Sequence, residues 1–156
     1  MNIALIGSGK MGRMLESLCE KDDGLHVAGF VGRTGYASLA DMEQVDVALD
    51  FSYPGNLESL LACAVAKKIP LVIGTTGLSE EQGEAIRKAS GEIPIVWADN
   101  FSTGVTVLCR LARLAAQSLG DDFDIEIVET HHRMKEDAAS GTAKQLLAYM
   151  DPKHEH

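Results

Sequence analysis

Residues 2–12, NIALIGSGKMG, join a short apolar run to a glycine-rich turn of the form G-x-G-x-x-G. The run predicts a buried strand over residues 2–7, and apolar residues at helical spacing predict a helix over residues 11–19. The glycines alone are a weak signal, but a turn that follows a strand and opens a helix is typical of dinucleotide-binding domains. Its backbone can approach a pyrophosphate, and the helix start offers unpaired N–H groups. We therefore predict a dinucleotide site at Gly7, Ser8, Gly9, Lys10, Met11 and Gly12, the alternative being a structural strand–helix turn.

Apolar runs alternate with helical segments through residue 101. Further strands are expected at residues 25–31, 45–51, 69–73 and 93–98. A helix is expected to start at Pro54, and Ser79 with Gln82 forms a capping box for the next one. Strands that are apolar throughout and separated by helices are typical of a parallel sheet covered on both faces. The sequence thus predicts an α/β fold, a Rossmann-type doubly wound parallel sheet.

The pattern changes near residues 100–103. Residues 103–119 predict a longer helix that ends at Gly120. Residues 123–128 alternate with a period of two, which predicts a half-exposed antiparallel strand. A polar loop then leads to a last short helix over residues 141–150. These elements indicate the start of a second domain.

The second predicted strand ends in Val31-Gly32-Arg33-Thr34, which holds no carboxylate. An NAD site usually carries Asp or Glu about 20 residues after the glycine turn, to bind the ribose 2′-hydroxyl. Arg33 is instead suited to pair with a 2′-phosphate, so NADPH is favoured over NADH. The alternative is a solvated surface arginine.

Several predicted strands end in polar residues. Gly74, Thr75 and Thr76 follow one strand, and residues 50–52 and 99–102 follow two others. Ligands of doubly wound sheets bind outside these strand ends, so Gly74 to Thr76 are expected to contact the ribose or the nicotinamide. The alternative is a hydroxyl-capped turn without a ligand.

Residues 129–143 form the densest polar segment of the chain. His131 and His132 titrate near physiological pH and are suited to moving a proton, and Lys135 offers a cation for a carboxylate. Ser140 has the features of a helix N-cap, so the N–H groups of the following Gly141 and Thr142 would form an anion site. The segment predicts a pocket for a small dianionic substrate with an adjacent proton donor, the alternative being a solvated charged loop. No metal site is expected, because adjacent histidines point in different directions.

Composition excludes several classes of function. The chain has 156 residues and a formal net charge of −9, which argues against nucleic-acid binding. Its apolar runs are too short for a membrane span, and its first residues lack a signal peptide. Three widely spaced cysteines, Cys19, Cys63 and Cys109, indicate reduced thiols in a cytoplasmic protein.

The segment HHRMKEDAASGTA, residues 131–143, resembles the signature H-H-x-x-K-x-D-A-P-S-G-T-A of the dihydrodipicolinate reductases. These enzymes of lysine biosynthesis are also called 4-hydroxy-tetrahydrodipicolinate reductases. Residues 7–12, 50–52, 74–77 and 100–102 match further blocks of the family in the same order. Ala139 stands where the family usually has proline, which removes no functional side chain.

The resemblance implies NAD(P)H-dependent reduction of 4-hydroxy-tetrahydrodipicolinate to tetrahydrodipicolinate in the diaminopimelate pathway. It implies a Rossmann domain over residues 1–101 and the first part of an α+β substrate-binding and tetramerisation domain over residues 102–156. Family members are longer, and the homotetramer needs the complete second domain. The alternative is a non-catalytic NADP-binding module or an inactive fragment.

The resemblance also implies roles for single residues. His131 and Lys135 would transfer protons, and the substrate's carboxylates would be bound by His132 and by the helix start at Ser140, Gly141 and Thr142. Arg33 would contact the adenosine ribose or its phosphate. The nicotinamide end would be lined by Gly74, Thr75, Thr76, Ala98, Asp99, Asn100 and Phe101.

Overall fold

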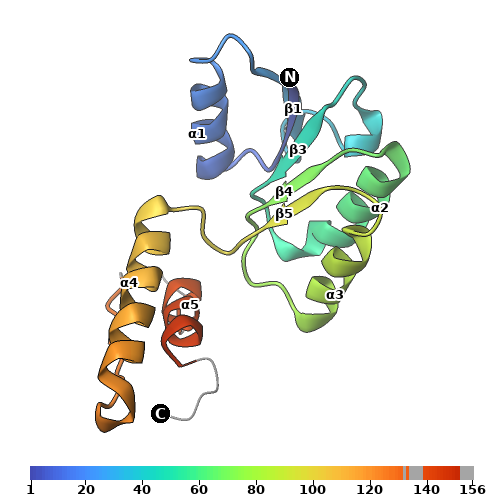
Figure 1. The fold of residues 1–156 in the computed structure, drawn as a ribbon. Helices are drawn as coiled ribbons and strands as arrows, with labels where there is room; N and C mark the ends of the chain where they lie inside the picture. The colour runs from blue at the N-terminus through green and yellow to red at the C-terminus, as the bar shows by residue number, and fades with distance from the viewer. Residues whose placement is uncertain (132, 134–138, 152–156) are drawn as a thin grey trace. The chain divides into compact units, whose positions relative to one another are not determined.

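The computed structural model describes residues 1–131, 133 and 139–151. The chain divides into two units, Met1–Ala98 and Asp99–His156, which are described separately below. The first unit is built on a five-stranded parallel sheet with the strand order β2-β1-β3-β4-β5 (Figure 1). The strands are β1 Asn2–Ile6, β2 His26–Val31, β3 Val47–Asp50, β4 Leu71–Ile73 and β5 Ile95–Trp97.

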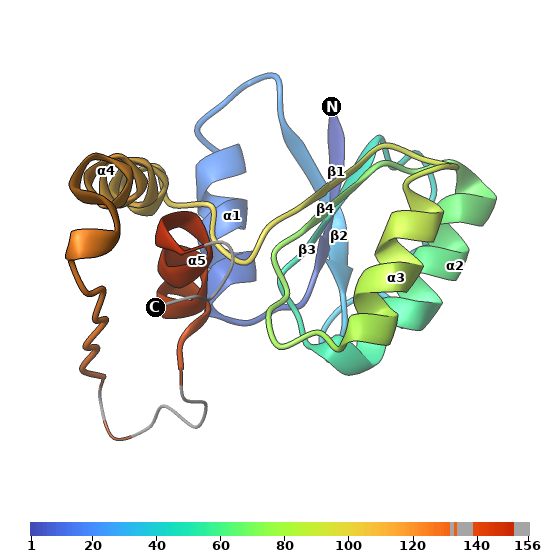
Figure 2. The same cartoon turned by 60° about the horizontal axis from the view of Figure 1, so that its bottom comes forward.

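Three helices cover the two faces of this sheet. They are α1 Lys10–Cys19, α2 Leu57–Lys67 and α3 Glu80–Ala89. Helix α1 lies on one face, and α2 and α3 lie side by side on the other (Figure 2). A parallel sheet with helices on both faces confirms the predicted α/β class.

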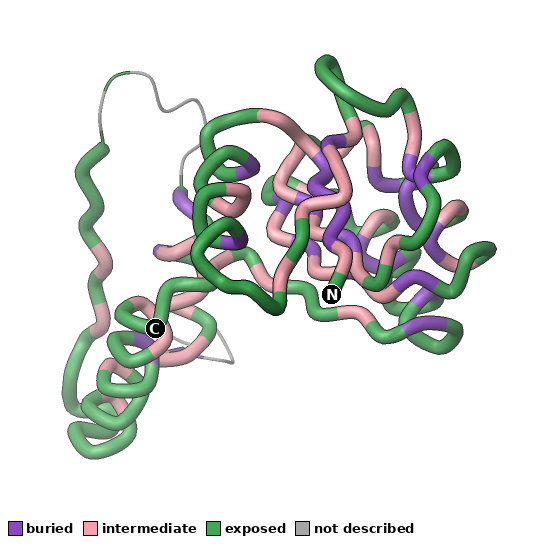
Figure 3. Tube along the Cα trace, turned by 90° about the horizontal axis from the view of Figure 1, so that it is seen from above, coloured by how far each residue is buried: buried purple, intermediate pink, exposed green. Residues whose placement is uncertain are grey.

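The alternation of side chains along β1 explains why this strand is buried on both sides. Ile3 and Leu5 pack on the α1 face, together with Cys19 and Phe30. Ala4 and Ile6 point to the opposite face, into the larger core formed with α2 and α3. The buried residues accordingly gather in the strands and on the helix faces turned toward them (Figure 3).

Strands β4 and β5 are shorter than the apolar runs that predicted them. Ile69 and Ile93 are buried, but both come before the residues that pair with neighbouring strands in the sheet. The Ile69 N–H donates to the carbonyl of Ala64, and the Ile93 N–H donates to the carbonyl of Ala89. Each isoleucine therefore completes the end of the preceding helix, and the strand starts two residues later.

The predicted starts of α2 and α3 are found with one difference. Pro54 opens a short 3₁₀ helix, Pro54–Asn56, and the α-helix begins only at Leu57. The capping box of α3 is present, with Gln82 N–H donating to Ser79 Oγ at 3.3 Å and Ser79 N–H donating to Gln82 Oε1 at 3.0 Å. Trp97 of β5 lies against α3, where a Cβ added at Gly83 would be 3.1 Å from its ring.

The second unit contains α4 Thr103–Leu119 and α5 Gly141–Met150, which pack against each other (Figure 1). Both helices were predicted with these bounds, and Gly120 ends α4 with a φ of 71°. Cys109 is fully buried on α4. The large apolar side chains of α4 are exposed instead, and Leu111 and Leu114 keep 59% and 61% of their surface.

The strand predicted over residues 123–128 is absent. This segment pairs with no strand in the part of the chain that the structure describes, and Val128 is 89% exposed. An alternating pattern marks a segment that can be half-buried in a sheet, but backbone pairing needs a partner strand. Within the described residues, no helix has the length and apolar character that a bilayer span requires.

Candidate functional site

The glycine-rich turn between β1 and α1 contains glycines with two different roles. Gly7 has a φ of +96°, and its N–H donates to the carbonyl of Val31 at 2.9 Å. A Cβ on Gly12 would collide with the carbonyl oxygen of Gly7, whereas a Cβ on Gly9 would meet nothing within 4 Å. Gly7 and Gly12 are thus required by the turn itself, and Gly9 leaves the backbone open to a ligand.

The first turn of α1 starts directly behind this open position. Its N-cap is Gly9, which has no side chain to accept from the N–H groups of the first turn. Lys10, Met11 and Gly12 provide these groups at the positive end of the helix dipole. Such a helix start is suited to binding an anion.

A cavity of about 330 Å³ lies at the carboxyl ends of β1 and β2. Its volume is within the range of small-molecule sites. Lys67 fixes one wall, because its ammonium donates to the carbonyl oxygens of Ala40 at 2.5 Å and Met42 at 2.8 Å. The cavity is lined by Ile6, Val31, Gly32, Ala37, Ser38, Leu39, Asn56, Ser59 and Leu60.

Arg33 follows the cavity residue Gly32 and is exposed. The chain turns back immediately after it, since Gly32 N–H donates to the carbonyl of Tyr36 and Tyr36 N–H donates to the carbonyl of Phe30. Arg33 therefore stands on a short loop that begins beside the cavity residue Gly32. A cation in this place can pair with a phosphate on a ligand that fills the cavity.

A buried carboxylate organises the ends of β3 and β4. Asp50 is 1% exposed and accepts from Ser52 Oγ at 2.6 Å and from Thr75 Oγ1 at 2.9 Å. Thr75 Oγ1 in turn accepts from Ser52 N–H at 2.9 Å. Burial raises the pKa of Asp50, and the hydrogen bonds from Ser52 and Thr75 oppose the shift. Thr76 is exposed beside this network.

Close packing also fixes the position of Gly74. A Cβ on Gly74 would collide with the ring of Phe51, and Gly74 N–H donates to the carbonyl of Asp50 at 2.8 Å. Ala98 N–H donates to the carbonyl of Ile73, which brings the end of β5 beside the end of β4. The structure therefore brings Gly74, Thr75 and Ala98 together at one edge of the sheet.

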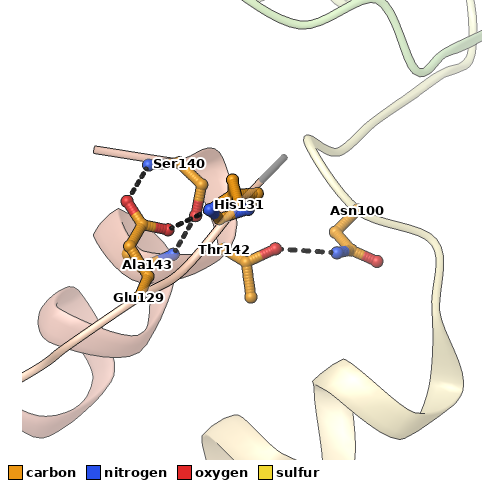
Figure 4. A network of polar contacts seen from close by, with 6 residues as sticks. All are labelled: Asn100, Glu129, His131, Ser140, Thr142 and Ala143. Carbon is orange, nitrogen blue, oxygen red and sulfur yellow. Dashed lines mark hydrogen bonds and ion pairs between the residues drawn. The ribbon is translucent and has the colours of Figure 1, made fainter. Parts of the chain in front are cut away.

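The second unit holds a separate polar cluster around the start of α5 (Figure 4). Ser140 caps this helix as predicted, because its Oγ accepts from Ala143 N–H at 3.1 Å. The N–H of Ser140 donates to Glu129 Oε1 at 2.7 Å, and Glu129 Oε2 lies 3.6 Å from His131 Nδ1. Glu129 thus joins the predicted proton donor to the predicted anion-binding helix start.

Asn100 enters the same cluster from the segment before α4 (Figure 4). Its Nδ2 donates to Thr142 Oγ1 at 3.2 Å, and its Oδ1 accepts from Ser102 N–H at 2.7 Å. Asp99 and Gly141 are near neighbours, since a Cβ on Gly141 would be 3.8 Å from that of Asp99. Phe101 is exposed in this segment.

Two predicted site residues, His132 and Lys135, lie outside the described residues. Two polar residues that the sequence did not place in the site have clear partners in it. Asp50 was noticed only as a polar strand end, although a carboxylate in a buried strand was a usable signal. Glu129 precedes His131 by two positions, a spacing that puts both side chains on one side of an extended segment.

Comparison with protein families matches both parts of the chain. Residues 1–101 match the family described as "Dihydrodipicolinate reductase, N-terminus", and residues 104–156 match "Dihydrodipicolinate reductase, C-terminus". The chain belongs to the dihydrodipicolinate reductase family. Members of this family use a pyridine nucleotide as cofactor.

Two curated relatives of this chain have the same name. The "4-hydroxy-tetrahydrodipicolinate reductase" of Pseudoalteromonas atlantica is 43% identical over 90% of this chain, and that of Xanthomonas campestris pv. campestris is 45% identical over 89%. The chain spans 61% and 63% of the length of these two relatives.

Among solved structures, a dipicolinate-bound dihydrodipicolinate reductase from Paenisporosarcina sp. TG-14 has the same fold. The TM-score is 0.73 at 23% identity, covering 97% of this chain and 66% of that one. A probable dehydrogenase from Thermotoga maritima matches with a TM-score of 0.54 over 76% of this chain. Both similarities support the Rossmann-type fold.

Proposed function

We propose that this chain binds NAD(P)H and takes part in reducing 4-hydroxy-tetrahydrodipicolinate to tetrahydrodipicolinate, in the diaminopimelate pathway of lysine biosynthesis. The observation that carries the proposal is the turn from Gly7 to Gly12, which opens toward a ligand at Gly9 and lies at the same sheet edge as the cavity. The named reaction comes from the relatives, which are 43% and 45% identical to this chain.

The cofactor would extend across the carboxyl ends of the strands. The start of α1, at the residues from Gly7 to Gly12, would hold the pyrophosphate, and the cavity would hold the adenosine. Arg33 pairs with the 2′-phosphate, which favours NADPH over NADH. The loop of Gly74, Thr75 and Thr76 would lie near the nicotinamide, with Thr75 buried beneath it, and so would the segment from Ala98 to Phe101 that follows β5.

A bound reduced nicotinamide supplies a hydride. The substrate would lose water and accept the hydride at C4 of the ring, and His131 would donate a proton to the neighbouring carbon. Glu129 keeps the imidazole oriented through Nδ1, so Nε2 is the atom free to face the substrate. The N–H groups of Gly141 and Thr142 at the start of α5 bind a carboxylate.

The proposed roles of His132 and Lys135 rest on the sequence alone. We propose that His132 binds a substrate carboxylate with Ser140, and that Lys135 is the second proton-transfer residue. We further propose a cytoplasmic location and a homotetramer once the second domain is complete. The partner is a small dicarboxylate, and we propose neither a nucleic-acid nor a membrane role.

Calorimetric titration of this chain with NADPH, and then with pyridine-2,6-dicarboxylate, tests the proposal. Both ligands are expected to bind, whereas a non-catalytic nucleotide module would bind only the first. Losing one charge-assisted hydrogen bond in Arg33→Ala should weaken NADPH by roughly tenfold and leave NADH nearly unchanged. Arg110→Ala, an exposed arginine of α4, is the matched control. Failure of the wild-type chain to bind NADPH contradicts the proposal.

A further inference from the structure

A charged group stands where the sheet would otherwise hold an apolar side chain. Asp50 ends the central strand β3, between Leu49 and Phe51, and only 1% of its surface is exposed. Burying a carboxylate is unfavourable unless hydrogen bonds replace its water. Here both carboxylate oxygens accept from hydroxyl groups, Oδ1 from Ser52 and Oδ2 from Thr75.

These hydrogen bonds join two loops that come from neighbouring strands. Ser52 follows β3 and Thr75 follows β4, and the Ser52 N–H also donates to Thr75 Oγ1 at 2.9 Å. Asn56, which lines the cavity, donates from Nδ2 to Ser52 Oγ at 3.3 Å. We call Asp50, Ser52, Asn56 and Thr75 the Asp50 network.

The Asp50 network also supports the glycine-rich turn. A Cβ on Gly7 would be 3.0 Å from the carbonyl oxygen of Phe51 and 3.1 Å from Cβ of Ser52, so the turn rests directly on this loop. The contact lies between β1 and β3, where the strand order of the sheet changes direction. Ligands of doubly wound sheets bind at this point.

We propose that Asp50 is a positioning residue that holds the Gly74–Thr76 loop in register with the glycine-rich turn, and so fixes the nicotinamide end of the cofactor. The proposal rests on the proposed function. Thr75 is buried through its bond to Asp50, and this bond fixes the direction of the exposed Thr76 and of the backbone of Gly74. The carboxylate itself is covered and does not contact a ligand.

The role predicts a selective effect on binding. Asp50→Asn keeps the shape of the side chain but replaces one acceptor oxygen with an NH₂ donor, so one of the two hydroxyls can no longer donate to residue 50. The loop after β4 then loses its fixed position, whereas the adenosine cavity keeps most of its wall. NADPH should bind about tenfold more weakly, and adenosine 2′,5′-bisphosphate, which lacks the nicotinamide half, should change by less than about threefold.

Titration of the 156-residue chain with these two ligands tests the proposal. Asp46→Asn is the matched control, because Asp46 lies just before the opposite end of β3 and accepts from Asn2 N–H at 2.6 Å. Thr75→Val removes the partner hydroxyl and should weaken NADPH about as much as Asp50→Asn. Thr75→Ser keeps the hydroxyl and should restore binding. The double variant Asp50→Asn/Thr75→Val should lose no more than the weaker-binding single variant, because both changes break the same link.

The outcomes separate this proposal from the proposed function. If wild type binds NADPH and Asp50→Asn binds it equally well, or loses both ligands to the same extent, Asp50 does not position the nicotinamide end, and the proposed function stands. Additive losses in the double variant also overturn the positioning role. If wild type binds neither ligand, the proposed function fails, and this proposal fails with it.

Discussion

Alanine at Gly12 should destabilise the fold, whereas alanine at Gly9 in the same turn should leave its stability nearly unchanged. In Gly12→Ala the new methyl group collides with the carbonyl oxygen of Gly7 and lies 3.3 Å from the ring of Phe30. The carbonyl cannot move freely, because Gly7 is held by its hydrogen bond to Val31. In Gly9→Ala the methyl group meets nothing within 4 Å, and the φ of −76° is one that alanine adopts.

The magnitude follows from these contacts. Overpacking against a fixed backbone atom costs up to about 3 kcal/mol. Alanine gains about 1 kcal/mol over glycine inside a helix, and Gly12 lies within α1. Gly12→Ala should therefore lower the free energy of unfolding by about 2 kcal/mol. For a chain of this length that is a fall in Tm of roughly 4–8 °C. In Gly9→Ala the weaker N-cap lowers the free energy of unfolding, and the less flexible unfolded chain raises it. The two contributions nearly cancel, so the net change is within about 0.5 kcal/mol.

Urea denaturation and NADPH titration of the two variants check this reasoning. Gly9→Ala should fold as stably as wild type and bind NADPH at least about tenfold more weakly, because its methyl group occupies the approach to the pyrophosphate. Gly12→Ala should lose stability as well as binding. A Gly12→Ala variant as stable as wild type would refute the packing argument. A Gly9→Ala variant with normal NADPH affinity would refute the assignment of the open position to the pyrophosphate.

Three other perturbations have defined outcomes. Ser140→Ala removes the hydroxyl that accepts from Ala143 N–H and should lower the free energy of unfolding, measured by urea denaturation, by about 1 kcal/mol. The control Ser118→Ala, on α4, should change it by less than about 0.5 kcal/mol. Equal losses in the two variants would contradict the capping role. Lys67→Met removes the ammonium that donates to three carbonyl oxygens of the segment 39–42. The backbone amides of this segment should then exchange hydrogen about fivefold faster. Unchanged exchange would show that Lys67 does not hold the segment in place. Burial raises the folded-state pKa of Asp50, so its stabilising contribution is complete below its ordinary pKa of about 4 and is lost as pH rises through the folded value. The unfolding free energy of wild type minus that of Asp50→Asn should therefore decrease as pH rises from about 4, and an increase would contradict the shift.

The parts of the fold that depend on local sequence were predictable. Residues 7–12 determine a turn whose glycines are required by contacts within a few residues, and Ser79 and Ser140 cap helices through bonds to residues three positions ahead. The strand predicted over residues 123–128 was wrong, because pairing depends on a partner that the pattern does not specify. The bounds of β4 were also wrong, since Ile69 is buried by ending a helix rather than by entering the sheet.

Residue types within one segment led to the prediction of a polar site over residues 129–143, of which the structure describes the contacts of Glu129, His131 and Ser140. Contacts between distant segments could not be predicted in this way. The link between Asp50 and Thr75 joins positions that are 25 residues apart in the sequence, and it forms only because β3 and β4 are neighbours. The approach of Glu129 to His131 was missed, because residue types two positions apart in sequence do not show which of their atoms face each other.

The chain contains a single tryptophan, and it lies in the first unit, at the end of β5 against α3. Its indole emission therefore reports the unfolding of the first unit, and the second unit has one tyrosine, Tyr149, and no tryptophan. Emission recorded beside far-ultraviolet dichroism, to which α4 and α5 contribute, distinguishes separate from concerted melting of the two units. Reduced nicotinamide absorbs where tryptophan emits, so quenching of Trp97 also gives a label-free measure of cofactor binding.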